Sequence, residues 1–281
     1  MHSEGNISLR ALALLRPEHA SPGNGMNATR RAFGWRLTLW TAAMVAALAS
    51  YGNAQEANHP VEVFQSSGKK IRLERFSTTN PGRHPVVFLT YGAAGMTAGG
   101  EAFRNYAYQL ADRGYVVFLI HYFDATESAT AGELPVTRSR FELWTKALND
   151  GITYAVKDPH VDKHHVGLLG FSLGAFLALW ESSQDSRVKV VCEYYGGTSL
   201  FLAPPQRMPT TLILHGEKDS TVPAEEAHKL QRLLEEHHAT YDMKIYPRLE
   251  HGFDGPDGDP AAAKDAWERT LAFFHKYLSS D

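Results

Sequence analysis

A serine flanked by two glycines offers the clearest chemistry in this sequence. Residues 170–174 are Gly-Phe-Ser-Leu-Gly, a G-x-S-x-G pattern with Ser172 at its centre. An apolar run typical of a strand precedes the pattern, and an apolar run of helical length follows it. In this setting a sharp turn exposes the serine oxygen, and the glycines let the flanking backbones approach closely. We expect Ser172 to be a nucleophile; the alternative is a phosphate-binding or plain tight turn.

A serine hydroxyl becomes a good nucleophile only when a base takes its proton and a further group orients that base. For a serine in a strand–turn–helix setting, the acid and then the histidine follow it along the chain. Asp219 comes shortly after the apolar run 211–215, and His251 lies in the segment after the run 241–246. We therefore expect Ser172, His251 and Asp219 to form a triad. Asp219 could instead cap the helix that follows it.

An oxyanion formed during acyl transfer needs two N–H donors. One comes from the residue after the nucleophile, here Leu173, and the other from the loop after the third strand. That loop begins Tyr-Gly-Ala-Ala-Gly at residues 91–95, and its small residues would let the backbone approach a substrate. We expect Ala93, or else Gly92, to be the second donor.

Strands and helices must alternate to place these residues at one edge of a sheet. Nearly continuous apolar runs predict buried strands at 85–91, 115–121, 165–170, 188–195 and 211–215, with a further strand at 241–246. Segments of helical length and period lie at 101–113, 138–156, 173–182, 224–237 and 261–278. The runs 61–64 and 71–76 alternate in polarity, which predicts an antiparallel edge.

This alternation predicts an α/β fold with a mainly parallel sheet of about eight strands and helices on both faces. We expect residues 55–281 to form a single domain without a large lid, because the segment 198–208 is only a short loop that contains proline. His121 and His215 also end strands, and we expect each to be packed beneath the site, hydrogen-bonded and uncharged.

The first 54 residues have a different character. The apolar run 37–49 follows Arg30, Arg31 and Arg36 and precedes a Gly-Asn-Ala exit, the parts of a secretory signal peptide. We expect cleavage after Ala54 and a secreted or periplasmic protein. Residues 29–33 are similar to a twin-arginine signal, and ordinary secretion is the other route. Alternatives are a retained membrane anchor or a buried N-terminal helix.

Composition excludes several classes of function. A formal net charge of −3 gives no general attraction for nucleic acid. Cys192 is the only cysteine, so neither an internal disulfide nor a cysteine-rich metal site can form. The histidine pairs at 164–165 and 237–238 are unsuited to chelation, because neighbouring strand residues point to opposite faces and the second pair ends a helix. We expect no metal and no cofactor, and the sequence does not indicate the oligomeric state.

Four segments together resemble the dienelactone hydrolase family: 90–95, 170–174, 214–223 and 246–253. The similarity runs from about Val86 to Leu278 and implies the α/β-hydrolase fold. The founding enzymes carry cysteine at the position of Ser172 and an acidic residue in the loop after the third strand. These two departures argue against carrying over their activity on dienelactone. The family's tyrosine before a glycine matches Tyr195, which the resemblance places in the acyl pocket.

The expected activity is hydrolysis of a small or solvent-presented carboxylic ester through an acyl-enzyme intermediate. A triad is indifferent to the leaving group, so a peptidase or thioesterase is an alternative, as is a non-catalytic binding protein of the same fold. Arg138 or Arg140 begins the helix after the loop 122–137, which borders the expected site. Either could hold a polar or anionic acyl group, and a solvated helix face is the alternative.

Overall fold

The computed structural model describes residues 59–97, 99–132 and 136–279. Its centre is an eight-stranded sheet in the order β1-β2-β4-β3-β5-β6-β7-β8. The strands are β1 (Val61–Ser66), β2 (Lys69–Phe76), β3 (His84–Thr90), β4 (Val116–Ile120), β5 (Val161–Phe171), β6 (Val188–Tyr194), β7 (Thr210–Gly216) and β8 (Tyr241–Tyr246). β2 pairs antiparallel with both β1 and β4, and all the other pairs are parallel. The predicted mainly parallel sheet with an antiparallel edge is confirmed.

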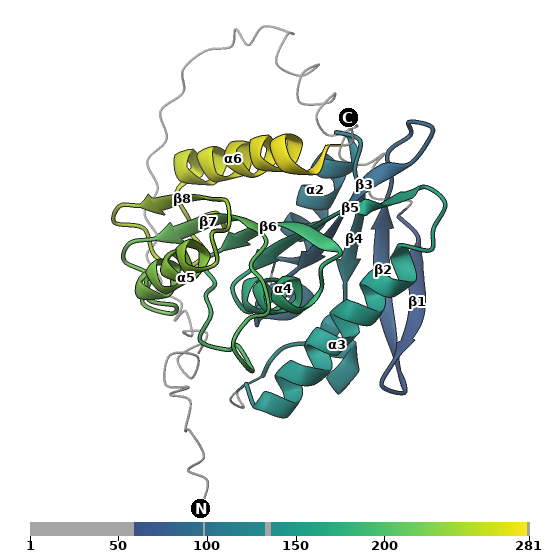
Figure 1. Ribbon diagram of the computed structural model, residues 1–281, viewed down its shortest axis with the longest axis horizontal. Coiled ribbons are helices and arrows are strands. Elements are labelled where there is room, and N and C mark those ends of the chain that lie inside the picture. Colours follow the sequence, from purple (N-terminus) through teal and green to yellow (C-terminus); the bar gives the residue numbers. More distant parts are fainter. Residues whose placement is uncertain (1–58, 98, 133–135, 280–281) are drawn as a thin grey trace, which may run out of the picture. The chain divides into compact units, whose positions relative to one another are not determined.

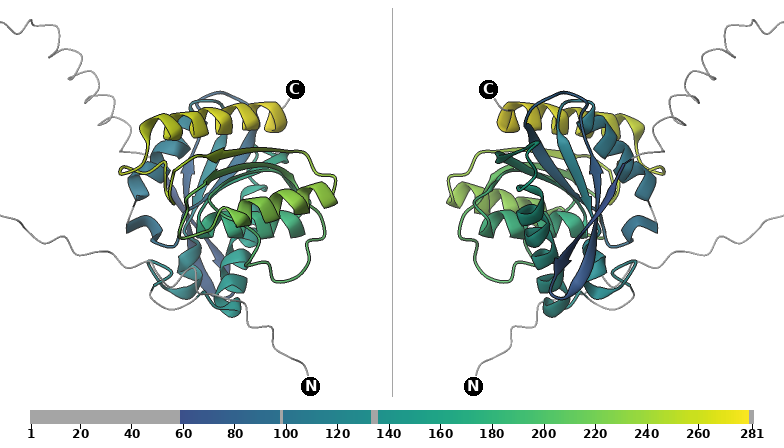
Figure 2. Two further views of the ribbon diagram at one scale, coloured as in Figure 1. Left: turned by 90° about the vertical axis from the view of Figure 1, so that its left-hand side faces the viewer. Right: turned by 90° about the vertical axis from the view of Figure 1, so that its right-hand side faces the viewer.

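Helices cover both faces of this sheet (Figures 1 and 2). α2 (Gly100–Ala111) and α6 (Pro260–Leu278) lie on one face, where Trp267 Nε1 of α6 donates a 2.7 Å hydrogen bond to Gln109 Oε1 of α2. The other face carries α3 (Arg138–Ala155), α4 (Leu173–Gln184) and α5 (Glu225–Glu236). Short 3₁₀ helices, η2 (Gly95–Thr97) and η3 (Tyr122–Thr126), follow β3 and β4.

The burial of each strand follows its place in the sheet. Residues 86–89 of β3 and 116–120 of β4 are almost inaccessible to solvent, because helices cover both of their faces. β1 is an edge strand, and Val61 and Val63 are exposed while Phe64 packs into the core. The apolar runs of the sequence thus became the central strands, and the alternating runs became the edge.

β5 begins earlier than its apolar pattern predicts. It starts at Val161, which pairs with His84 of β3 before a register shift that lets the ladder resume at Val86 and Val166. Polar residues occupy this first part of the strand, so hydrophobicity could not indicate it. The segment 198–208 is a loop as expected, with no helical lid in it.

Parallel strands direct their carboxyl ends to one edge, where open α/β sheets bind their ligands. The loops after β3, β5, β7 and β8 meet there and contain the residues of the candidate site. Among the helices of the described residues, none has both the length and the apolar character needed to cross a membrane.

Candidate active site

Ser172 occupies the sharp turn between β5 and α4. Its φ of 52° and ψ of −121° lie in a region that residues other than glycine rarely adopt. Its backbone N–H donates a 2.9 Å hydrogen bond to the carbonyl of Tyr194, which ties the turn to the end of β6. A strained backbone held by its surroundings indicates a functional constraint at this serine.

The glycines of the turn are required by close packing. A Cβ on Gly170 would lie 2.6 Å from the Cα of Ala175, and one on Gly174 would lie 2.2 Å from the carbonyl oxygen of Thr90. The Thr90 hydroxyl donates a 2.8 Å hydrogen bond to the carbonyl of Gly174, which fixes α4 against β3. Any side chain at either glycine would push the helix away and move Ser172 with it.

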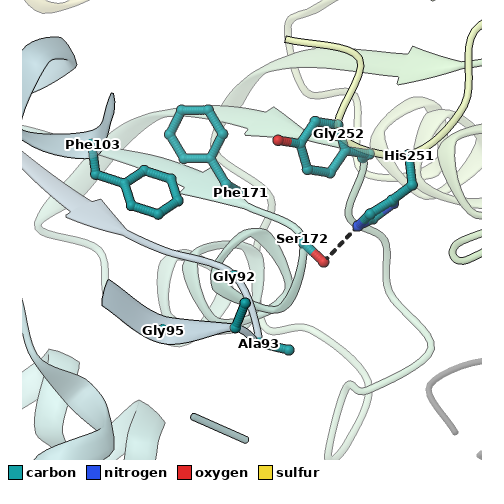
Figure 3. Close-up of a pocket in the computed structure, with 10 residues that line it drawn as sticks. Gly92, Ala93, Gly95, Phe103, Phe171, Ser172, His251 and Gly252 are labelled. Atoms are coloured by element: carbon teal, nitrogen blue, oxygen red, sulfur yellow. Dashed lines mark hydrogen bonds between the residues drawn. The ribbon is translucent and has the colours of Figure 1, made fainter. Parts of the chain in front are cut away.

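Ser172, His251 and Asp219 come from three separate loops and lie in one chain of hydrogen bonds. The Ser172 Oγ is 2.9 Å from His251 Nε2 (Figure 3). On the other side of the ring, His251 Nδ1 is 2.7 Å from Asp219 Oδ2. Because an ionised carboxylate only accepts, Nδ1 carries the imidazole hydrogen and Nε2 can accept the serine proton. The structure brings together the three residues that the sequence singled out.

The carboxylate of Asp219 is held from several sides. Its Oδ1 accepts hydrogen bonds from the backbone N–H groups of Thr221 at 2.9 Å and Val222 at 2.7 Å. His215 Nε2 lies 3.4 Å from Oδ2, the oxygen that also faces His251. Asp219 is buried, so these contacts leave the carboxylate little freedom to rotate and thereby orient the imidazole of His251.

The two other strand-end histidines are both buried. His215 is inaccessible to solvent, and its Nε2–H donates a 2.8 Å hydrogen bond to the carbonyl of Val222. Burial lowers the pKa of His215, which keeps it neutral as expected. His121 Nε2 is 2.8 Å from a carboxylate oxygen of Glu74.

Glu193 is a buried acid that the sequence analysis missed, because it lies within the apolar run of β6. Its Oε2 accepts a 2.7 Å hydrogen bond from the N–H of Gly196, and its Oε1 has no partner among the described residues. Burial and the nearby charge of Asp219 raise the pKa of Glu193 to about 8. A protonated Glu193 avoids a second negative charge beside Asp219 at neutral pH.

The two expected oxyanion donors lie in segments close to Ser172. Leu173 is the first residue of α4, so its N–H has no acceptor within the helix. The loop containing Ala93 passes directly beside the serine, since a Cβ on Gly92 would lie 3.3 Å from the Ser172 Cβ. Within the part of the chain that the structure describes, neither the Leu173 nor the Ala93 N–H donates a hydrogen bond.

A cavity of about 250 Å³ opens beside the Ser172 hydroxyl. Small residues of the loop after β3 form one side, and aromatic rings form another (Figure 3). The lining residues are Gly92, Ala93, Ala94, Gly95, Phe103, Phe171, Ser172, Tyr195, His251 and Gly252. The cavity is therefore mainly apolar, with Ser172 and His251 as its reactive groups.

Tyr195 lines this cavity, as the family resemblance implies. Its ring centroid is 4.6 Å from that of His251, and its hydroxyl donates a 2.8 Å hydrogen bond to Asp254 Oδ1. The hydroxyl of Tyr106, from α2, donates to the other carboxylate oxygen of Asp254 at 3.0 Å. Burial raises the pKa of Asp254, and the two phenol hydrogen bonds oppose that rise. Sequence reasoning missed both Asp254 and Tyr106.

The structure does not bring Arg138 or Arg140 into the lining of the cavity. Arg138 is exposed, and its guanidinium donates a 2.8 Å hydrogen bond to Glu142 one helical turn later. The Arg140 guanidinium donates to the carbonyl of Ala131 at 2.6 Å and lies 4.9 Å from the ring centre of Trp144. Both side chains are engaged at the start of α3.

Two other expectations concern metals and export. Among the described residues, no three histidine, cysteine, aspartate or glutamate side chains are grouped as a metal site would require. The expected signal peptide and its cleavage after Ala54 lie outside the described residues.

Comparison with known proteins identifies relatives across most of the chain. The model of the dienelactone hydrolase family matches residues 74–278. A carboxymethylenebutenolidase of Rhodococcus opacus is 25% identical over 228 residues, which cover 71% of this chain and 89% of the relative.

Two solved structures share the fold. A dienelactone hydrolase-like promiscuous phosphotriesterase from metagenomic libraries has a TM-score of 0.67 at 16% identity, covering 79% of this chain and 99% of that chain. An acylaminoacyl peptidase of Pyrococcus horikoshii has a TM-score of 0.66 at 12% identity, covering 82% of this chain and 44% of the peptidase. At these identities the similarity concerns the fold, which is common to enzymes of different specificity.

Proposed function

Because this chain belongs to the dienelactone hydrolase family, we propose that it hydrolyses carboxylic esters with Ser172 as the nucleophile. The observation that carries the proposal is the hydrogen-bonded series from Ser172 through His251 to Asp219, at 2.9 Å and 2.7 Å. The strained serine turn and the adjoining cavity support it further.

In the first step, His251 Nε2 takes the hydroxyl proton while Ser172 Oγ attacks the ester carbonyl. The imidazolium that forms is stabilised by Asp219, to which its Nδ1–H already donates. No rotation of the imidazole is needed, because both of its nitrogens are already aligned in the resting site.

The carbonyl oxygen gains negative charge as the tetrahedral intermediate forms. We assign the stabilisation of this charge to the N–H groups of Leu173 and Ala93. The Leu173 donor also lies at the N-terminus of α4, where the helix dipole favours an anion. This assignment is supported by the hydrogen-bonding pattern, because neither N–H donates to another acceptor within the described residues.

Collapse of the intermediate expels the alcohol, to which His251 returns the proton, and leaves an acyl group on Ser172. Water then attacks this ester with His251 again acting as the base, which releases the carboxylic acid and restores the hydroxyl. The reaction needs no external cofactor, since the only proton transferred in each half passes through His251.

The relatives do not determine which kind of bond this chain cleaves. A triad can also cleave thioesters and peptides, and the Pyrococcus protein is named as a peptidase. The residues matched here cover less than half of that peptidase chain, so its specificity is not carried over with the fold. The small cavity at Ser172 supports an ester with a small acyl group.

The test combines labelling with kinetics. A fluorophosphonate probe should label the wild-type protein at Ser172, and Ser172→Ala should lose the label while keeping its thermal unfolding midpoint. Hydrolysis of 4-nitrophenyl butyrate by Ser172→Ala should fall by roughly 10⁴-fold or more, because only binding and oxyanion contributions remain. A folded Ser172→Ala protein that hydrolyses the ester at the wild-type rate would refute the proposal.

A further inference from the structure

The aromatic side of the cavity presents hydrocarbon rather than polar groups to a bound acyl chain. The rings of Phe103 and Phe171 have centroids 5.3 Å apart, and both line the cavity beside Ser172 (Figure 3). Tyr106, which does not line the cavity, stacks on Phe171 with centroids 5.3 Å apart and planes inclined by 12°. None of the ten lining residues, all in the described part of the chain, is a lysine or arginine.

The phenol hydroxyls next to the cavity have already donated their hydrogens. Tyr195 donates to Asp254 Oδ1 at 2.8 Å and Tyr106 donates to Asp254 Oδ2 at 3.0 Å. A phenol has a single hydrogen to donate, so neither tyrosine can donate to a substrate carboxylate without releasing Asp254. The aromatic wall of the cavity, formed by the rings of Phe103, Phe171 and Tyr195, therefore has no hydrogen-bond donor free to bind an anion.

Asp254 places a negative charge behind these rings, because both of its oxygens accept phenol hydrogens, as those of an ionised carboxylate do. Asp254 is partly buried, and it interacts electrostatically with His251, whose ring contacts that of Tyr195. Asp219 lies on the opposite side of the imidazole, bonded to Nδ1. The arginines of the neighbouring helices are engaged elsewhere, since Arg104 of α2 makes two hydrogen bonds to Glu74 and Arg140 of α3 donates to the carbonyl of Ala131.

We propose that this site selects uncharged, apolar acyl groups and rejects acyl groups bearing a carboxylate, with Asp254 as the specificity-determining residue. Asp254 acts in two ways: it withdraws both phenol hydrogens from the substrate, and its charge opposes a second anion in a poorly solvated cavity. The inference rests on the proposed ester hydrolysis at Ser172 and names its substrate class.

The first test needs only the wild-type protein and three 4-nitrophenyl esters of similar size. The acyl groups are 6-methylheptanoate, the neutral amide of adipate, and adipate itself, which end in an isopropyl group, a carboxamide and a carboxylate. We expect kcat/KM to fall along this series, with the carboxylate at least tenfold below the amide. Since amide and carboxylate differ mainly in charge, equal values for these two would overturn the inference.

The second test removes the charge of Asp254. In Asp254→Asn the ratio of kcat/KM for amide over carboxylate should shrink by roughly tenfold, the effect of one unit charge across a short, partly screened distance. Asp265→Asn is the matched control, because Asp265 also accepts a tyrosine hydrogen bond, from Tyr246 at 2.8 Å, but Tyr246 does not line this cavity, whereas the Asp254 partner Tyr195 does. An unchanged ratio in Asp254→Asn, or an equal change in Asp265→Asn, would overturn the assignment of Asp254.

Arg138→Ala tests for an anion receptor at the start of α3. A selective rise in KM for the carboxylate ester in this variant would show such a receptor and overturn the inference, whereas unchanged values for all three esters support it. Failure of the inference is distinguishable from failure of the proposed function. If Ser172→Ala abolishes hydrolysis of all three esters, Ser172 is the nucleophile whatever the acyl preference. The relative rates of the wild-type protein on the three esters then test the acyl selectivity alone.

Discussion

The position of the His251 imidazole depends on one oxygen of one carboxylate. Two backbone N–H groups, of Thr221 and Val222, bind Asp219 Oδ1 and leave Oδ2 facing His251 Nδ1. These donors require an oxygen at the Oδ1 position. In an Asp219→Asn variant the amide nitrogen must therefore take the place of Oδ2 and present hydrogens to the imidazole.

Asp219→Asn should consequently lower kcat by about 10⁴-fold while leaving the fold intact. The amide hydrogens would favour the tautomer with a bare Nδ1 and a protonated Nε2, which cannot accept the Ser172 proton. Kinetics on 4-nitrophenyl butyrate together with circular dichroism provide the measurement. A loss below tenfold in a folded variant would show that Asp219 does not orient His251.

Glu193 should make the stability of the protein depend on pH. Its pKa is about 8 in the folded protein against an ordinary value of 4.5, so between these values the folded state binds a proton that the unfolded state lacks. The free energy of unfolding therefore falls as pH rises through this window, by at most about 1.4 kcal/mol per pH unit from this group.

In Glu193→Gln this dependence is absent. The difference in unfolding free energy, variant minus wild type, should therefore rise steadily from pH 5 to pH 8 in urea titrations. Glu268→Gln is the control, since Glu268 is exposed, and its curve should run parallel to the wild type. Parallel curves for Glu193→Gln as well would contradict a protonated, buried Glu193.

Single residues differed in how well the sequence indicated them. Ser172, Asp219 and His251 each stand in a local pattern beside a strand end, so chain order and spacing were enough to nominate them; their catalytic roles stay predictions. Asp254 and Tyr106 are 148 positions apart and meet only through the packing of α2 against the loop after β8. Glu193 lies inside an apolar run, where periodicity gives no sign of a carboxyl group.

At the scale of elements, the site depends on how closely α4 approaches β3. Gly174→Ala would put a methyl group 2.2 Å from the carbonyl oxygen of Thr90, a backbone atom that cannot move aside cheaply. We expect a loss of about 2–4 kcal/mol in stability and a disproportionate loss of kcat, because any shift of α4 displaces Ser172 and the Leu173 N–H.

Gly100→Ala is the matched control at the start of another helix. The added methyl group would approach a flexible end of Met96 at 3.2 Å, so stability should change by less than about 1 kcal/mol. Urea unfolding and ester hydrolysis of the two variants make the comparison. Equal behaviour of the two variants would show that the contact between Gly174 and Thr90 does not control the serine turn.

The elements themselves were largely predictable, because central parallel strands are nearly uniform apolar runs and the helices between them keep a clear period. The extent of β5 was not, since its first residues, from Val161 to His165, are mainly polar and are ordered by pairing with β3. Pairing across a sheet is a property of two distant segments, and neither segment alone indicates it. For the same reason the sequence could not indicate the aromatic wall, which combines rings from α2, β5 and the loop after β6.

At the scale of the whole molecule, the sequence predicts a removable N-terminal segment and a folded domain that remains after its removal. We propose that residues 1–54 direct export and that the mature protein begins near Gln55. Mass spectrometry of the protein recovered outside the cytoplasm should find Gln55 at or near the N-terminus. Recovery only of the intact chain, in the membrane fraction, would instead favour a retained anchor.

If residues 1–54 are an export signal, their removal should leave the stability and the activity of the folded domain unchanged. The first strand, β1, begins at Val61, and its ladder to β2 runs from Val61 paired with Glu74 to Ser66 paired with Lys69. Every residue proposed for catalysis or acyl selection lies between Gly92 and Asp254, well inside the domain that this ladder opens.

A chain that begins at Gln55 should therefore match the chain of residues 1–281 in its urea unfolding midpoint and in kcat/KM for 4-nitrophenyl butyrate. The comparison uses both forms purified under the same conditions, with Ser172→Ala in each form as the inactive reference. A drop of more than about 1 kcal/mol in unfolding free energy would show that residues 1–54 contribute to the fold, since a change of that size is a large part of a domain's stability. A tenfold change in kcat/KM at equal stability would show that these residues act on the site itself, and the proposal of a removable export signal would have to be abandoned.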